Sequence, residues 1–182
     1  MIRTFVGIPL PGAVVRDLTA AQAGLPAGRA VAPENFHLTL AFIGEHPEPV
    51  IEDLHLALDR ITGAGFQVSL AGAGLFGNKR PRVLYAGVRS GPELGRLREK
   101  VVQAARGAEI PLARERYTPH VTLARLNSGL SPEDAAELRD FAARRAGFST
   151  APFRIEGFAL FRSTLGRNGA IYEALAKYPL DK

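Results

Sequence analysis

The chain has 182 residues, enough for one sizeable domain, and its hydrophobic and charged fractions of 46% and 23% are ordinary for a globular protein. It has no cysteine, which excludes disulfides, thiol nucleophiles and cysteine-ligated zinc. Its formal net charge of +5 favours anionic ligands, but the sequence has no long run of Lys and Arg typical of a nucleic-acid-binding tail. No stretch resembles a membrane span, and the opening MIRTFVGIPL lacks the pattern of a signal peptide, so we expect a cytoplasmic protein without a membrane partner.

The spacing of apolar residues divides the chain into strands and helices. The expected strands cover residues 2–8, 36–43, 66–71, 82–88, 119–126, 153–162 and 170–177. The expected helices cover residues 11–23, 47–62 and 92–106, and a fourth helix begins at residue 131. That fourth start is strong because Ser131 is a good N-cap, Pro132 suits the first helical position, and two acids follow. No change in composition marks a linker, so we expect a single domain over residues 1–182.

The order of these elements repeats along the chain. A strand, a helix, a strand with polar residues and a second helix occur once in each half, with further strands between. This order predicts a duplicated α+β unit, folded as two intertwined lobes around one core.

Two short segments share an unusual pattern. Residues 35–44 read NFHLTLAFIG and residues 117–126 read YTPHVTLARL, so each apolar strand contains His-aliphatic-Thr-Leu. The two histidines, His37 and His120, lie 83 residues apart, close to half the length of the chain. One His-x-Thr is more often structural than functional, but two copies in matching apolar strands favour a functional role.

Strand geometry determines where these side chains point. Successive residues face opposite sides of a sheet, so His37 and Thr39 share one face, as do His120 and Thr122. A dry core cannot hold these polar faces without partners, and a pseudo-two-fold axis would bring both to one cleft. Two imidazoles can share acid and base roles near neutral pH, and threonine hydroxyls can donate to phosphate oxygens. The constellation suits phosphodiester hydrolysis without a metal or other cofactor.

With these motifs and their flanks, the chain resembles the 2H phosphoesterases, and more closely the RNA 2′,3′-cyclic phosphodiesterase family, formerly called 2′-5′ RNA ligases. The likeness covers nearly the whole chain and rests on RTFVGIPL, ENFHLTLAFIGE, RPRVLYAGV, YTPHVTLAR and LFRSTLGRNGAIYEALAKYPL. It implies a bilobal fold in which two antiparallel sheets line a central cleft, with helices outside. It also implies a monomer acting on RNA 3′ ends, which opens a terminal 2′,3′-cyclic phosphate to a 2′-phosphate and weakly catalyses the reverse 2′-5′ ligation.

The resemblance also assigns roles. His37 would protonate the departing 3′ oxygen, His120 would activate water, and Thr39 and Thr122 would hold the phosphate. Arg125 matches the arginine of the family's HVTLAR segment and would bind phosphate. Strict alternation places Arg125 on the face opposite His120, however, so it reaches the cleft only if the strand bulges; a surface or structural ion pair is the competing interpretation.

Several other residues have less specific interpretations. By parity Phe42 belongs to the apolar face, and we assign it to the core together with Phe161 and Tyr172. GAGLFG at residues 72–77 leads into a strand rather than a helix, so we expect turns there and no dinucleotide site. Three basic residues of the following segment are either RNA contacts or solvated, namely Lys79, Arg80 and Arg82. The remaining histidines, His46 and His55, are expected at the surface.

Two alternative functions remain open. The same site could act on a small cyclic nucleotide or on ADP-ribose cyclic phosphate. A non-catalytic RNA- or nucleotide-binding module is the third possibility, although a pure binder does not need paired proton carriers.

Overall fold

The computed structural model describes residues 1–77, 80–113, 116–166 and 169–181. The strands are β1 (Ile2–Pro9), β2 (Arg29–Ala30), β3 (His37–His46), β4 (Phe66–Phe76), β5 (Val83–Ser90), β6 (His120–Arg125), β7 (Phe153–Ile155), β8 (Gly157–Gly166) and β9 (Gly169–Pro179). The helices are α1 (Gly12–Ala21), α2 (Glu48–Asp59), α3 (Pro92–Gly107) and α4 (Pro132–Arg144), with a 3-10 turn, η1, at Pro33–Asn35. None of the helices in the described part of the chain has the length and apolarity needed to cross a bilayer.

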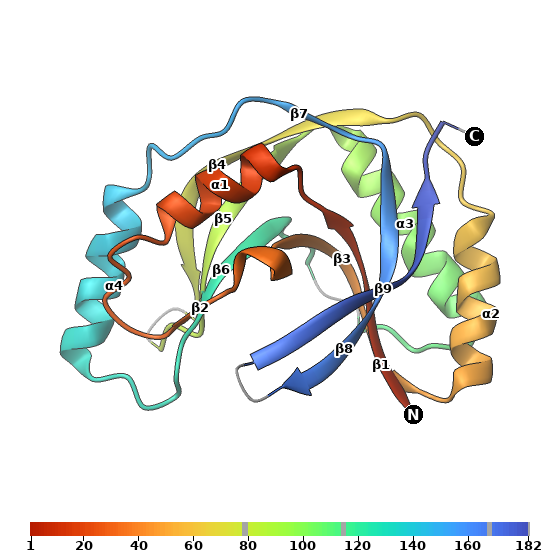
Figure 1. Cartoon of the computed structure of the whole chain (residues 1–182), viewed down its shortest axis with the longest axis horizontal. Coiled ribbons are helices and arrows are strands. Elements are labelled where there is room, and N and C mark those ends of the chain that lie inside the picture. Colours follow the sequence, from red (N-terminus) through yellow and green to blue (C-terminus); the bar gives the residue numbers. More distant parts are fainter. Residues whose placement is uncertain (78–79, 114–115, 167–168, 182) are drawn as a thin grey trace.

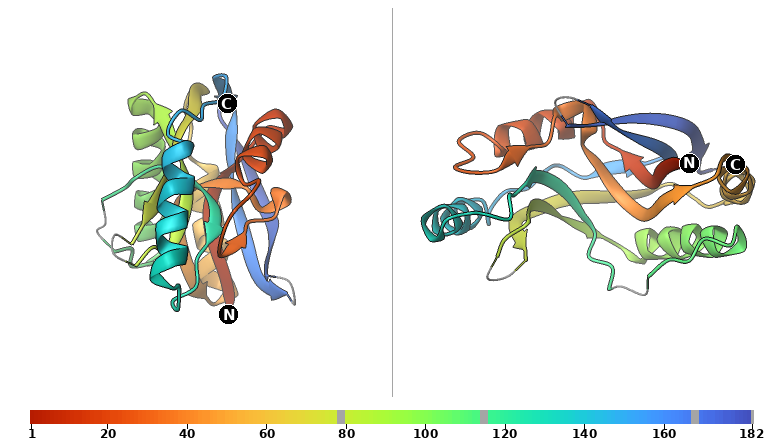
Figure 2. Two further views of the ribbon diagram at one scale, coloured as in Figure 1. Left: turned by 90° about the vertical axis from the view of Figure 1, so that its left-hand side faces the viewer. Right: turned by 90° about the horizontal axis from the view of Figure 1, so that it is seen from below.

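The described strands form one antiparallel sheet, which is strongly curled (Figure 1 and the right-hand view of Figure 2). The order is β7-β4-β5-β6-β3-β1-β8-β9, and the short β2 pairs with β6. The two separate sheets that we expected are therefore halves of a single sheet. They join at the centre, where Leu38 of β3 pairs with Val121 of β6. This pairing satisfies backbone groups that two isolated edge strands would leave open.

The expected duplication is visible in the order of elements. The series β1-α1-β3-α2 has its counterpart in β5-α3-β6-α4, and corresponding elements begin 80 to 84 residues apart. Because Leu38 and Val121 occupy equivalent places in the two series and pair antiparallel, a local two-fold axis passes between them.

Helices of the second series pack against elements outside their own series. Helix α3, from the second series, packs against β3 and α2 of the first, while α4 packs against β4. Figure 1 shows α2 and α3 on one side of the molecule and α1 and α4 on the other. Arg145, just after α4, donates to the carbonyl oxygens of Ala21 and Ala23 at the end of α1, at 2.6 Å each. One continuous cluster of buried apolar residues runs through the described structure.

The helices form where the sequence predicted them. In α4 the Ser131 hydroxyl accepts a hydrogen bond from the Asp134 amide at 3.0 Å, which confirms the expected N-cap. Each helix buries the apolar residues that recur at helical spacing, as Leu94, Leu97 and Val101 do in α3.

The glycine-rich segment from residue 72 was wrongly expected to form turns. Strand β4 continues through it to Phe76, and the turn begins only at Gly77, which has a φ of +105°. Gly74 lies under the Tyr85 ring, where a Cβ would come within 2.6 Å of the phenolic oxygen. The glycine therefore makes room for a cross-strand aromatic ring rather than for a turn.

Candidate active site

The two His-x-Thr motifs lie side by side at the centre of the sheet. From the Leu38–Val121 pair, one residue further along the antiparallel register places His37 opposite Thr122 and Thr39 opposite His120. Leu38 and Val121 are fully buried, whereas the four polar residues are partly exposed on the other face. In such a ladder the two histidines are diagonal neighbours, about 7–8 Å apart between their Cα atoms. The structure therefore brings together the four residues that the motifs singled out.

Both imidazoles are anchored in the same way. Nδ1 of His37 lies 2.7 Å from the Asn35 carbonyl oxygen, and Nδ1 of His120 lies 2.8 Å from that of Thr118. A carbonyl oxygen only accepts, so each Nδ1 carries the proton and each Nε2 is left for other partners. In the neutral ring Nε2 accepts a proton, and in the charged ring it donates one.

His37 lies in the more enclosed environment. Its ring centroid is 4.5 Å from that of Phe5 and 5.2 Å from that of Tyr172, which meets it edge-on. The pKa of His37 is lowered to about 4, chiefly by burial; the hydrogen bond to Asn35 opposes this shift, and the positive charges of Arg125 and His120 add to it. The ligand-free protein therefore holds His37 neutral at pH 7.

His120 is surrounded by a different pair of rings. Phe76 meets it edge-on at 4.8 Å and Tyr85 at 5.5 Å between ring centroids. These two rings stack on each other at 4.0 Å with an interplanar angle of 18°. This aromatic wall fixes one side of the His120 imidazole and faces the same cleft.

A β-bulge follows the His-x-Thr motif in each strand. Val6 and Gly7 are consecutive in β1, but they pair with Ala41 and Thr39, which leaves Leu40 as an extra residue in β3. In the same way Leu84 and Tyr85 pair with Ala124 and Thr122, which leaves Leu123 as an extra residue in β6. An extra residue inverts the alternation of side chains beyond it.

The bulges place Phe42 and Arg125 on the histidine face. Arg125 is exposed there, and its charge acts on His37. The strand therefore has the bulge that we expected to be necessary for Arg125 to reach the cleft. The assignment of Phe42 to the core was wrong, because its side chain is 65% exposed. Phe161 and Tyr172 were also misplaced, since both are only partly buried and their rings face His37. The signal available in the sequence was the doubled apolar residue after each motif, Leu40-Ala41 and Leu123-Ala124.

Beside His120 lies a cavity of about 450 Å³, which we call the aromatic pocket. Its lining includes Thr39, Phe42, Phe76, Arg98, Tyr117 and His120. The Tyr117 hydroxyl donates to the Thr39 carbonyl oxygen at 3.0 Å, and the Arg98 guanidinium lies 4.6 Å from the centre of the Tyr117 ring. The pocket thus combines aromatic walls with a cationic rim next to the paired motifs.

A second cavity, of about 370 Å³, lies toward β2 and the β8–β9 hairpin, and we call it the arginine pocket. Its lining includes Arg3, Arg29, Asn35, Arg125, Ser163 and Tyr172. Three of these, Asn35, Arg125 and Tyr172, also interact with His37. The two pockets therefore flank the histidine pair.

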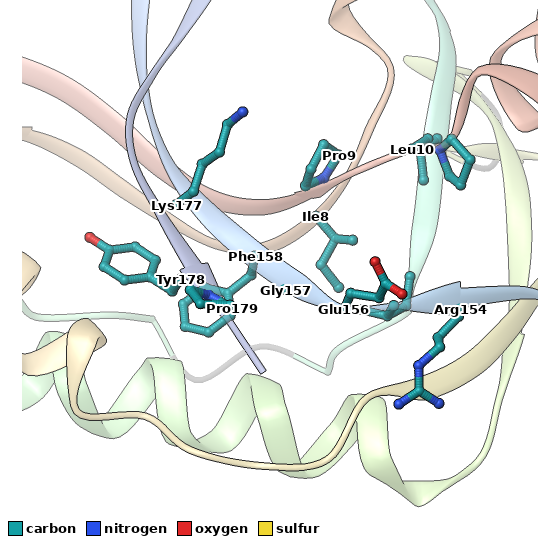
Figure 3. A pocket seen from close by; sticks show the side chains of 12 residues that line it. Ile8, Pro9, Leu10, Arg154, Glu156, Gly157, Phe158, Lys177, Tyr178 and Pro179 are labelled. Carbon is teal, nitrogen blue, oxygen red and sulfur yellow. The ribbon is translucent and has the colours of Figure 1, made fainter. Parts of the chain in front are cut away.

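Other cavities lack this combination. Figure 3 shows one of about 530 Å³ between the end of β1 and the β8–β9 pair, with Lys177 and Arg154 on opposite sides. Arg80 and Arg82 line another, of about 440 Å³, whereas Lys79 lies outside the described residues.

The two remaining histidines lie away from the site. His55, exposed as expected, forms a hydrogen bond with the Tyr178 hydroxyl, and the partly buried His46 forms one with the Ile43 carbonyl oxygen. None of these residues lines the two pockets described above.

Comparison with known proteins agrees with this arrangement. A family model described as the 2′-5′ RNA ligase superfamily matches residues 10–167. An RNA 2′,3′-cyclic phosphodiesterase of Aeropyrum pernix is 35% identical over 88% of this chain and 90% of its own length. Another, from Geobacillus stearothermophilus, is 31% identical over 97% of this chain, which spans 56% of that relative.

A solved structure of E. coli LigT with 3′-AMP has a TM-score of 0.81 and 28% identity, covering 100% of this chain and 99% of that one. Structures of the same E. coli protein with ATP, NADP+ and phosphate are also similar to this chain.

Proposed function

The chain belongs to the 2′-5′ RNA ligase superfamily, and from that membership we propose that it hydrolyses the 2′,3′-cyclic phosphate at RNA ends to a 2′-phosphomonoester. The observation that carries the proposal is the pairing of the two His-x-Thr motifs across β3 and β6, each histidine with a free Nε2. Curated relatives about 30% identical to this chain are RNA 2′,3′-cyclic phosphodiesterases.

The proposed reaction uses the two histidines as proton carriers. Neutral His120 accepts a proton from water through Nε2 as the water oxygen forms a bond to phosphorus. The bond between phosphorus and the 3′ oxygen breaks, and the Nε2 proton of charged His37 passes to that oxygen. Thr39, Thr122 and Arg125 donate to the non-bridging oxygens, where negative charge develops.

The acid role of His37 requires a change of protonation on binding. With its pKa near 4 the free protein holds His37 neutral at pH 7. A bound phosphate anion favours the imidazolium, and it also neutralises the Arg125 charge that lowers the pKa of His37. The negative charge of the bound substrate therefore raises the pKa of His37 and allows it to be protonated and to act as the acid.

The aromatic pocket suits the base of the terminal nucleotide. Phe42 and Phe76 line it within reach of Thr39 and His120, which line the same cavity. Every base can stack on an aromatic ring, so the pocket would bind the terminal nucleotide of an RNA with little preference for its base. A nucleotide site here is also consistent with the E. coli relative, which has been solved with 3′-AMP.

Small cyclic nucleotides and ADP-ribose cyclic phosphate offer the same chemistry at phosphorus and are the second class of substrate. When the 5′ hydroxyl of a second RNA replaces water as the nucleophile, the same proton transfers break the bond to the 3′ oxygen and form a 2′-5′ linkage, which accounts for weak ligation. The arginines beside His37 favour a substrate with further phosphates, which an RNA end carries. A binding module without turnover would not require two imidazoles with free Nε2 atoms.

We expect His37→Asn and His120→Asn each to lower kcat for a short RNA ending in a cyclic phosphate by about 10²–10⁴-fold. His46→Asn, outside the site, is the control and should retain the wild-type rate. Thermal melts of the three variants check that the fold is intact. Near-normal turnover in either site variant would contradict the paired roles.

Product analysis tests the leaving group and the mechanism together. We expect a 2′-phosphate product and undiminished turnover in excess EDTA. A 3′-phosphate product would reverse the assignment of the leaving oxygen. Turnover that appears only when a divalent metal is added would overturn the proton-transfer mechanism.

A further inference from the structure

The arginine pocket contains an unfavourable pair of charges. Arg29 of β2 lies directly opposite Arg125 of β6 in the antiparallel register, so both side chains project from the same face of the sheet. Like charges that face each other across strands destabilise a sheet. Their juxtaposition next to His37 costs stability unless an anion binds between them.

No carboxylate in the described structure relieves this pair. The described ion pairs are Arg154–Asp181 and Arg162–Glu173, and acidic side chains do not line the described part of the pocket. The third arginine, Arg3, does have Glu45 opposite it in the β1–β3 register. The uncompensated charge therefore lies mainly on Arg29 and Arg125.

The pocket is also a built structure rather than a loose surface cluster. The Arg29 guanidinium lies against the backbone of Gly169, where a Cβ would come within 3.0 Å of its Nη2 atom. The Asn35 side chain donates to the Ala170 carbonyl oxygen at 2.7 Å, and the Asn35 carbonyl oxygen accepts from His37. The β8–β9 hairpin thus fixes the pocket wall and the imidazole through shared contacts.

We propose that the arginine pocket binds a second phosphate of the substrate, the phosphodiester on the 5′ side of the terminal nucleotide. This rests on the proposed function, with the cyclic phosphate held between the two histidines and the base in the aromatic pocket. Arg29 is the specificity-determining residue, because Arg125 also reaches the reacting phosphate. An RNA end then bridges both pockets, whereas a nucleoside 2′,3′-cyclic phosphate occupies only one.

The test compares three substrates that differ only at the 5′ position. They are adenosine 2′,3′-cyclic phosphate, the same compound with a 5′-phosphate, and the dinucleotide ApA with a terminal cyclic phosphate. A hydrogen-bonded charge pair is worth about 1.5–3 kcal/mol, so Arg29→Gln should lower kcat/KM for the two 5′-phosphorylated substrates by about 10–100-fold. For the nucleoside it should change kcat/KM little, and Arg144→Gln, which removes an exposed arginine from α4, is the control for net charge.

Salt dependence gives an independent readout. With ApA cyclic phosphate, Arg29→Gln should reduce the slope of log kcat/KM against log salt concentration by about 0.7, the value for one contact to a single strand. Arg144→Gln should leave the slope unchanged. If Arg29→Gln unfolds the protein, Arg3→Gln in the same pocket should produce the same substrate selectivity to a smaller degree.

The outcomes separate this inference from the proposed function. Hydrolysis of all three substrates with equal efficiency would overturn the second phosphate site and leave the phosphodiesterase activity standing. Equal losses on the nucleoside and the dinucleotide in Arg29→Gln would also overturn it. If none of the substrates is hydrolysed, calorimetry still tests the site: the affinities of 5′-AMP and adenosine are measured for the wild type and for Arg29→Gln. A preference for 5′-AMP that Arg29→Gln loses would show that Arg29 recognises phosphate.

Discussion

At the scale of single residues, the two histidines share an anchor and differ in surroundings. Each Nδ1 is fixed by a carbonyl oxygen two residues earlier, so the tautomer follows from local backbone geometry. Burial among aromatic rings, and to a lesser degree the charge of Arg125, lowers the pKa of His37, whereas His120 lies against Phe76 and lines the aromatic pocket. Equivalent side chains in a duplicated strand thereby become suited to different roles.

The pKa of His37 can be changed through Arg125. Burial is the larger cause of its depression, and the guanidinium contributes to it. We expect Arg125→Gln to raise the pKa of His37 from about 4 toward its ordinary value, as measured by NMR titration of the imidazole. With Arg144→Gln as the control, an unchanged titration in both variants would show that Arg125 does not act on His37.

At the scale of the strand, one inserted residue determines which side chains enter the cleft. The bulges at Leu40 and Leu123 occur at the same distance after each motif, and each carries the residue five positions after the histidine into the site. That residue is Phe42 in one strand and Arg125 in the other. The duplicated strands therefore present an aromatic ring on one side and a guanidinium on the other.

Phe42→Ala distinguishes this placement from a core position. A buried phenylalanine costs about 3–5 kcal/mol on truncation, but an exposed one should cost less than about 1 kcal/mol. We expect KM for a cyclic-phosphate RNA end to rise by about 5–100-fold, because stacking on one base is worth about 1–3 kcal/mol. Leu56→Ala, an exposed apolar residue of α2, should change neither KM nor the melting temperature. A large loss of stability in Phe42→Ala would show that the Phe42 side chain is buried in the core and not exposed in the cleft.

At the scale of the whole molecule, the two halves of the sheet are held together by few direct contacts between strands. The described register joins β3 to β6 through one residue pair, and β2 extends the junction along β6. Helices therefore contribute much of the connection. Gln22 at the end of α1 donates to the carbonyl oxygens of Val31 and Leu123, and Arg145 links α4 to α1.

Arg145→Ala tests this helical connection. It removes the two hydrogen bonds to α1, together with a 3.4 Å hydrogen bond to the Phe141 carbonyl oxygen and a contact with the Phe141 ring. We expect the free energy of unfolding to fall by about 1.5–3 kcal/mol, as measured by urea denaturation. The neighbouring Arg144→Ala should change it by less than about 0.5 kcal/mol, because its side chain is exposed. Equal effects of the two substitutions would show that the link between α4 and α1 does not stabilise the fold.

The sequence by itself determined the features that depend on local geometry. Alternation along a strand placed His37 with Thr39 and His120 with Thr122, and helical spacing and the Ser131 cap located the helices. The duplicated order of elements was also readable, because each repeat has the same local pattern.

The tertiary structure decided what depends on pairing between distant segments. A bulge exists only relative to a partner strand, so parity alone misplaced Phe42 and left Arg125 unresolved. The joining of the two halves into one sheet required the Leu38–Val121 pair. Strand β2 has two residues and no periodicity of its own, so only its pairing with β6 brought Arg29 opposite Arg125 and created the charged pocket.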